Sequence, residues 1–260
     1  MNTVIAIKPS GKPYKFYAPS TWNEVNEKQL VTWAAITLKR LSFGDAARLA
    51  MIVFYRMPVK LFFSVPEAQK VQLAPTLRFL FGHNTLTQWV IPRIRRRFRW
   101  YYGPEHRLQN ITIGEYSRTE LYYQAYVKRN DEKALDMLIA TLYRPLRKGT
   151  AERDIREELS DISIRKRAKR MSTLSKRYRH AILLNYEGCR NFIRVNFLDK
   201  LPSEGGTKPD EIFDYNKVIL AVAGANGKFG TKSETERAFL YDFLQHLVTN
   251  AEEIAKLKTN

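Results

Sequence analysis

The sequence predicts a mainly helical protein whose bundle-like body carries an N-terminal β-hairpin. Three observations predict this class. Long segments place apolar residues at helical spacing between capping residues and prolines. Strand-like alternation surrounds one early turn. The 260 residues are 44% hydrophobic, which is enough for a sizeable core. A second short segment, residues 91–104, fits either a further small β element or a helix.

The N-terminal hairpin is expected over residues 3–19. The letters PSGK at positions 9–12 supply turn chemistry. Apolar residues alternate on each side of that turn, at Ile5 and Ile7 before it and at Tyr14 and Phe16 after it.

Helices are expected from there to the C-terminus, because capping and breaking residues bracket each periodic run. Pro58 and Pro145 are each expected to end a helix. Pro75 is expected to kink a further helix, which Gly82 ends. The expected N-terminal caps are Thr21 with Glu24, Ser42 with Asp45, Thr112 with Glu115, Asp131, and Ser233 with Glu236.

The domain organisation follows from one linker-like stretch. Residues 202–211 contain two glycines and two prolines and read as a linker. We therefore expect a mainly helical body over residues 1–201 and a C-terminal helical pair over residues 212–260, packed on the body.

The charge balance points to an anionic partner. Lys and Arg number 44 and Asp and Glu 26, giving a formal net charge of +18. Acidic residues are missing from residues 68–104 and 162–186, and a basic cluster lies in each gap. The candidate contact residues are Arg93, Arg95, Arg96, Arg97, Arg99, Arg165, Lys166, Arg167, Lys169, Arg170, Lys176, Arg177 and Arg179.

The segment IPRIRRRFRWYYGP at residues 91–104 holds most of the first cluster. As one strand, it would place Ile94, Phe98, Trp100 and Tyr102 on one face, and Arg95, Arg97 and Arg99 on the other. The aromatic residues could stack on nucleic-acid bases or belong to the core. The second cluster predicts an amphipathic helix with a basic outer face.

The sequence contains no recognisable motif for phosphate binding, metal binding or catalysis. The glycines of GANGKFGTKS lack the spacing of a phosphate-binding loop, and the four histidines lack metal-ligand spacing. The single cysteine, Cys189, sits in an apolar helical pattern and is expected to be buried. No catalytic residue, cofactor or metal is expected. We expect a non-secreted protein without a transmembrane segment, because no apolar run reaches membrane length.

Several stretches resemble a family encoded in the structural-gene modules of tailed phages and prophages. They are STWNEVNEKQL, YYGPEHRLQNITIGEY, ATLYRP, DIRE, LLNYEGCR and VILAVAGANGKFGTKSETERAFLYDFLQHL. The resemblance implies a protein similar to tail-assembly chaperones, located in the host cytoplasm or the virion. Its implied partners are phage structural proteins, such as the tape measure or the tail tube. The dense arginine run before YYGP departs from that family.

Two functions therefore stay open. The first is a non-enzymatic phage assembly or structural protein that binds other phage proteins through basic and apolar surfaces. The alternative is a nucleic-acid-binding protein that uses both basic clusters.

Overall fold

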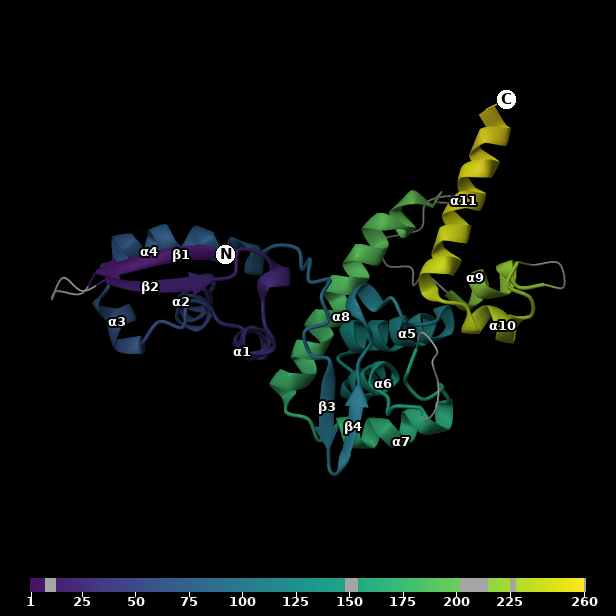
Figure 1. The fold of residues 1–260 in the computed structure, drawn as a ribbon, viewed down its shortest axis with the longest axis horizontal. Coiled ribbons are helices and arrows are strands. Elements are labelled where there is room, and N and C mark those ends of the chain that lie inside the picture. Colours follow the sequence, from purple (N-terminus) through teal and green to yellow (C-terminus); the bar gives the residue numbers. More distant parts are fainter. Residues whose placement is uncertain (8–12, 148–153, 202–214, 225–227, 260) are drawn as a thin grey trace. The chain divides into compact units, whose positions relative to one another are not determined.

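The structure is a computed structural model that describes residues 1–7, 13–147, 154–201, 215–224 and 228–259 (Figure 1). Helices form most of the described chain, and the β-structure consists of two antiparallel two-stranded sheets. The predicted fold class is confirmed, including the N-terminal hairpin and the further small β element. The predicted turn at residues 9–12 and the predicted linker at residues 202–211 both lie outside the described residues.

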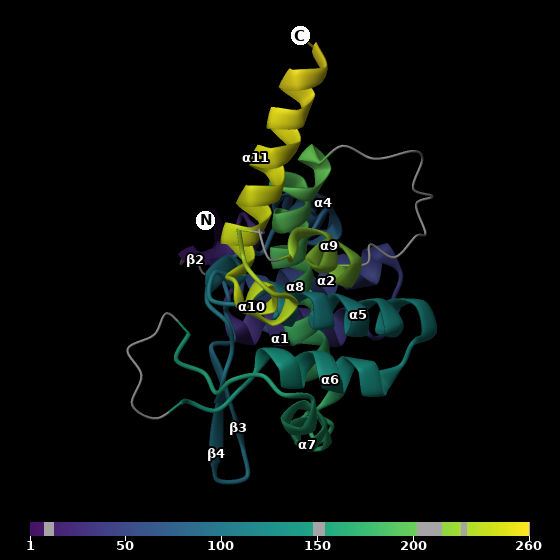
Figure 2. The same cartoon turned by 90° about the vertical axis from the view of Figure 1, so that its right-hand side faces the viewer.

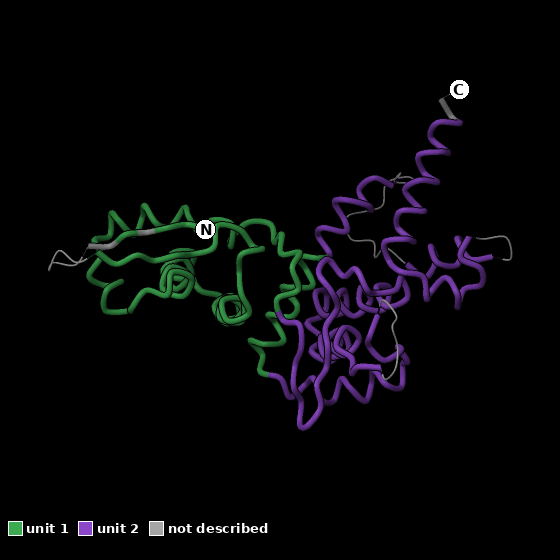
Figure 3. The backbone as a smooth tube through the Cα atoms, viewed as in Figure 1, with its two compact units in different colours: residues 1–90, 175–189 green, residues 91–174, 190–260 purple. Residues whose placement is uncertain are grey.

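The chain divides into two compact units, shown in different colours in Figure 3. Unit 1 contains residues 1–90 and 175–189, and unit 2 contains residues 91–174 and 190–260. The long helix α8 (Lys176–Asn196) contributes its first part to unit 1 and its last turns to unit 2.

Unit 1 combines the first hairpin with short helices. Its elements are β1 (Asn2–Ile7), β2 (Pro13–Ala18), α1 (Glu27–Thr37), α2 (Phe43–Phe54), α3 (Val59–Ser64), α4 (Glu67–Leu73) and a 3-10 segment, η2 (Ala74–Phe81). Ser42 caps α2 as expected, since its side chain accepts a hydrogen bond from the Asp45 backbone. The cap predicted at Thr21 is wrong, because Asn26 and Gln29 form the capping box of α1.

An extended segment, residues 84–90, packs against α8 within unit 1. The buried Asn185 side chain accepts a hydrogen bond from Val90 N at 2.9 Å and donates one to the Gln88 carbonyl at 2.8 Å. Gly188 allows the close approach, because a Cβ there would lie 2.3 Å from the Leu86 carbonyl oxygen. Cys189 is buried beside the same segment, as predicted.

Unit 2 is a group of helices with the second hairpin on its edge. Its elements are β3 (Arg93–Arg96), β4 (Arg99–Tyr102), α5 (Ile113–Arg129), α6 (Glu132–Leu142), α7 (Asp161–Met171), α9 (Tyr215–Val222), α10 (Lys232–Arg237) and α11 (Leu240–Thr259), with the end of α8. The predicted caps at Thr112 and Asp131 are confirmed by hydrogen bonds to the first turns of α5 and α6.

The C-terminal helices pack on α5. Backbone hydrogen bonds join Ile113 N to Ala238 O and Leu240 N to Ile111 O, at 2.9 and 3.0 Å. The described part of the C-terminal region therefore holds three helices in place of the expected pair, because the chain leaves the helical conformation between α10 and α11, where these bonds form. The capping box of α10 uses Thr231 with Glu234, two residues before the predicted pair of Ser233 and Glu236.

Candidate binding surface

The arginine-rich segment forms a tight β-hairpin, which we call the arginine hairpin (Arg93 to Tyr102). β3 and β4 pair in antiparallel register, with Ile94 opposite Tyr101 and Arg95 opposite Trp100. The turn consists of Arg97, which has a φ of 52°, and Phe98. The strand interpretation of this segment is therefore correct and the helical alternative is wrong.

The faces expected for a single strand are wrong, because the chain reverses at the turn. Residues directly opposite in an antiparallel pair share one face. Ile94 and Tyr101 share the buried face, at 3% and 0% exposed. Trp100 lies on the opposite face and is 40% exposed, while Phe98 at the turn is 95% exposed.

Two arginines cover the exposed tryptophan. The guanidinium carbon of Arg93 lies 4.7 Å from the centre of the Trp100 ring, and that of Arg95 lies 5.9 Å from it. Such cation–π contacts hold the guanidinium groups in place without neutralising them. Trp100 is thus a platform for arginines, and its ring is less available to a partner than that of Phe98.

Part of the second basic cluster lies beside this hairpin. Arg170 in α7 donates a hydrogen bond from Nη1 to the Tyr101 hydroxyl at 2.7 Å. A hollow of about 410 Å³ forms there, lined by Arg96, Arg97, Phe98, Arg99, Tyr101 and Arg170. The exposed Lys166 precedes Arg170 by one helical turn and so lies on the same side of α7.

We use the name hairpin surface for the cations that meet here together with the exposed phenylalanine. In Figures 1 and 2 the tip of the arginine hairpin extends past α7. Arg99 of the hairpin pairs with the Glu157 carboxylate, with Nη2 2.5 Å from Oε1. The hairpin surface consists of Arg93, Arg95, Arg96, Arg97, Phe98, Arg99, Lys166 and Arg170.

The other candidate residues are distributed differently. Arg165 and Lys169 are exposed on α7, whereas Lys176, Arg177 and Arg179 belong to unit 1. Two candidates, Arg167 and Arg179, are buried, at 4% and 7% exposed. Their placement corrects the expectation of a wholly solvent-facing cluster: a helix that packs on one side must bury some of its residues, even in a basic run.

Arg167 is a structural arginine. Its Nε donates to the Ala140 carbonyl and its Nη1 to Ser163 Oγ, both at 3.0 Å. Burial, with a smaller contribution from the positive charge of Arg144, lowers the pKa of Arg167 to about 10.

A buried ion network behind the hairpin was not predicted from the sequence. Arg144 and Arg156 are each 2% exposed. Arg156 binds Asp154 through two hydrogen bonds, from Nε at 2.8 Å and from Nη2 at 3.0 Å. Arg144 also pairs with Asp154, at 2.6 Å, and both arginines pair with the buried Glu115.

Burial and pairing act in opposite directions on these charges. Burial lowers the pKa of Arg144, and Glu115 opposes that change. For Asp154, burial favours a higher pKa, but the hydrogen bonds from Arg156 and the two positive charges bring its pKa below the ordinary value. Two arginines and two carboxylates therefore balance one another in the interior.

The network holds the base of the arginine hairpin. Tyr102 and Arg144 form an antiparallel bridge, with backbone hydrogen bonds of 2.7 and 3.0 Å. Nη1 of Arg144 also donates to the Glu157 carbonyl, while the Glu157 carboxylate pairs with Arg99. The buried Arg144 therefore fixes the base of the hairpin that carries the exposed arginines.

The sequence contains no local signal for this network. The stretches NITIGEY, ATLYRP and DIRE contain Glu115, Arg144, Asp154 and Arg156, but none has a spacing that joins these residues. The network depends on tertiary contacts between segments up to 41 residues apart.

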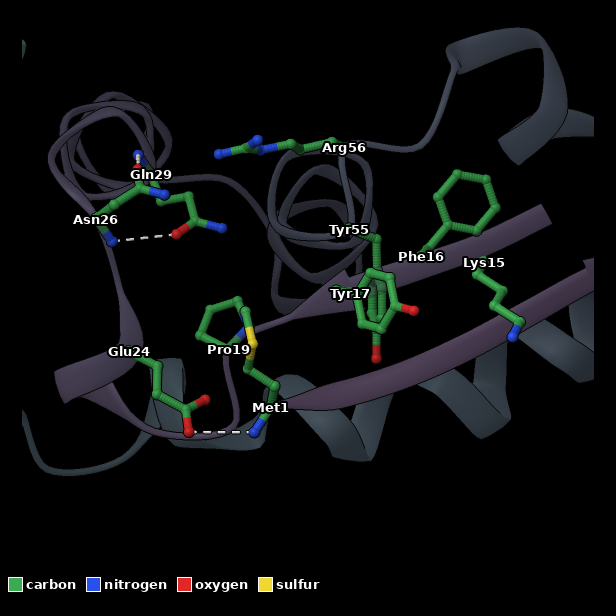
Figure 4. A pocket seen from close by; sticks show the side chains of 10 residues that line it. All are labelled: Met1, Lys15, Phe16, Tyr17, Pro19, Glu24, Asn26, Gln29, Tyr55 and Arg56. Atoms are coloured by element: carbon green, nitrogen blue, oxygen red, sulfur yellow. Dashed lines mark hydrogen bonds and ion pairs between the residues drawn. The ribbon is translucent and has the colours of Figure 1, made fainter.

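Two other pockets are less suited to a charged partner. In unit 1, a pocket of about 350 Å³ contains the N-terminal amine, which pairs with Glu24 at 3.1 Å (Figure 4). In unit 2, a pocket of about 540 Å³ lies beside the ion network. Arg118 and Arg147 line it, and each is already paired, with Asp161 and Glu158 respectively.

Within the described residues, no group of His, Cys, Asp and Glu side chains could hold a metal ion. None of the helices described is both long and apolar enough to cross a membrane. No protein-family model, curated protein or solved structure matches this chain.

Proposed function

We propose that this chain is a non-enzymatic phage assembly or structural protein that binds an anionic partner through the hairpin surface. The observation that carries the proposal is the meeting of two basic segments around Phe98, with one paired carboxylate, that of Glu157. Clustered cations attract and orient an oppositely charged surface during encounter. An exposed aromatic residue among arginines has the composition of an interface hot spot.

The family resemblance supplies the first candidate partners. It implies binding to phage structural proteins, such as the tape measure or the tail tube. Under this interpretation the partner presents carboxylates to the arginines and an apolar pocket to Phe98. Most of the affinity would then come from the few buried anchor residues.

Nucleic acid is the second candidate partner, favoured by a separate observation. Exposed cations line the outer face of the arginine hairpin and its turn: Arg93 and Arg95 on the outer face and Arg97 at the tip, next to the exposed Phe98. Phosphates would meet these cations, and a base could stack on the Phe98 ring.

A matched pair of triple variants tests the proposal. The hairpin triple, Arg95→Ala, Arg97→Gly and Lys166→Ala, removes three exposed cations, and glycine suits the positive φ at position 97. The control triple, Arg78→Ala, Arg129→Ala and Lys60→Ala, removes three exposed cations elsewhere.

Each form of the full chain would be titrated with the tape-measure and tail-tube proteins of its own gene cluster and with duplex DNA. We expect the hairpin triple to lose at least about tenfold in affinity for the true partner, since each charge-assisted contact contributes more than about 1 kcal/mol. The control triple should bind like the unmodified chain. Equal binding by the two triples would exclude the hairpin surface as the contact.

A further inference from the structure

The outer face of the arginine hairpin carries a row of cations at regular spacing. Arg93 and Arg95 lie on the outer face of β3, and Arg97 follows at the turn. All three are exposed, and none forms an ion pair within the part of the chain that the structure describes. Side chains on one face of a strand repeat about every 6.6 Å. The opposite face packs inward through Ile94 and Tyr101, so a partner meets the row from one side only.

We propose that this row binds the backbone of single-stranded nucleic acid and that a base stacks on the Phe98 ring. This inference rests on the proposed function, because it uses the same hairpin surface and names its partner. A polynucleotide carries one charge on every unit, so it offers a phosphate at each step along the row. A single strand needs only such a narrow track, whereas a stable protein interface involves about 20–30 residues on each side.

Phe98 favours a single strand over a duplex. Its side chain is 95% exposed at the turn, next to Arg97 at the end of the row. Base faces within a duplex are covered by their stacked neighbours, whereas the bases of a single strand can turn a free face to an aromatic ring. A phosphate bound at Arg97 would place the adjoining base beside Phe98.

The two arginines at the start of the row are positioned before a strand binds. The guanidinium carbons of Arg93 and Arg95 lie 4.7 and 5.9 Å from the centre of the Trp100 ring. Each guanidinium presents a planar fork of N–H donors that matches the oxygens of a phosphate. Because the ring already orders both side chains, they lose less conformational entropy when the strand binds.

The test uses the full chain and three labelled ligands of equal length, each roughly 12 nucleotides, which is comparable to the site sizes of single-strand binding proteins. The ligands are a deoxythymidine strand, an abasic strand with the same sugars and phosphates, and a duplex. We expect the deoxythymidine strand to bind most tightly. Phe98→Ala should lower the affinity for this strand about tenfold and leave that for the abasic strand unchanged, because the lost contact is with a base.

Two further variants and a spectroscopic signal sharpen the test. Phe98→Tyr, which keeps the ring, should bind like the unmodified chain, and so should Phe63→Ala, which removes an exposed phenylalanine of unit 1. The fluorescence of Trp100 reports on the outer face, because the other three tryptophans are at most 4% exposed. A bound strand should protect Trp100 from quenching by acrylamide, and an absence of protection would contradict binding at this face.

The outcomes separate this inference from the proposed function. Tighter binding to the duplex than to the deoxythymidine strand would overturn the inference, as would binding of that strand by Phe98→Ala equal to that of the unmodified chain. If the hairpin triple still bound less tightly than the control triple, the proposed function would stand. Binding to an acidic tail protein, with none to either single strand at low salt, would likewise overturn the inference alone. Equal affinity of the hairpin and control triples for every partner would remove the proposed function itself.

Discussion

Unit 2 contains two sets of arginines in very different surroundings. Arg144 and Arg156 are buried and share Glu115 and Asp154 between them. Arg95 and Arg97 are exposed, and neither takes part in an ion pair found in the described structure. Buried arginines therefore support the fold at the base of the arginine hairpin, whereas exposed arginines supply charge along its outer face and at its tip.

The difference teaches that local charge density does not identify the structural arginines. The densest arginine run of the chain is the exposed one, whereas the deeply buried Arg144 is the one charged residue of ATLYRP and the deeply buried Arg156 lies in the mixed-charge segment DIRE. A buried guanidinium needs carboxylates or carbonyls around it, because an unpaired buried charge is costly. Acidic neighbours in space therefore distinguish the two sets.

Replacing one buried arginine should have the largest effect. Arg156→Met leaves the Asp154 and Glu115 carboxylates with only Arg144 as a buried counter-charge. We expect the free energy of unfolding to fall by about 3–5 kcal/mol, as for other broken buried pairs. Chemical denaturation of the full chain measures it. A loss under about 1 kcal/mol would show that the network contributes little to stability.

Acid should weaken the same network. Since the folded-state pKa of Asp154 is lowered, its contribution to stability is present above the unfolded-state pKa and is lost as pH falls through the folded-state pKa. The free energy of unfolding should therefore decline below about pH 4, near the ordinary aspartate pKa. Asp154→Asn should flatten that decline. An unchanged pH profile in this variant would contradict the assigned role of Asp154.

Arg167 should give the smallest effect. This buried arginine bonds a carbonyl and a hydroxyl, and no carboxylate of the described residues lies within hydrogen-bond reach of it. Arg167→Met removes a desolvated charge and leaves no buried carboxylate behind. We expect a change of less than about 1.5 kcal/mol in either direction. A loss as large as that of Arg156→Met would mean that burial alone, and not carboxylate pairing, sets the cost.

Local signals in the sequence were sufficient for the outline of the fold. Ser42, Thr112 and Asp131 cap helices where their spacing predicted it, because a cap depends on residues three positions apart. Thr21 and Ser233 do not cap the helices that follow them. Another capping pair lies within five residues of each, Asn26 with Gln29 and Thr231 with Glu234, and forms instead. The hairpin at residues 93–102 needed a turn at Arg97, a residue that rarely marks one.

The candidate surface was only partly predictable. The arginines of residues 93–99 were identified by charge, but their faces depended on the position of the turn. The contact between Arg170 and Tyr101 joins residues 69 positions apart, and no local pattern encodes it. Burial of Arg167 and Arg179 likewise depended on which side of each helix packs inward.

The salt dependence of binding tests the central claim most directly. For duplex DNA, the logarithm of the binding constant falls with the logarithm of salt concentration by about 0.9 for each neutralised phosphate. We predict that the hairpin triple flattens this slope by up to about 3, for three lost cations, while the control triple keeps the original slope. Thermal unfolding would check that both variants remain folded. Equal slopes for the two folded triples would contradict the claim that the arginine hairpin contacts the nucleic acid.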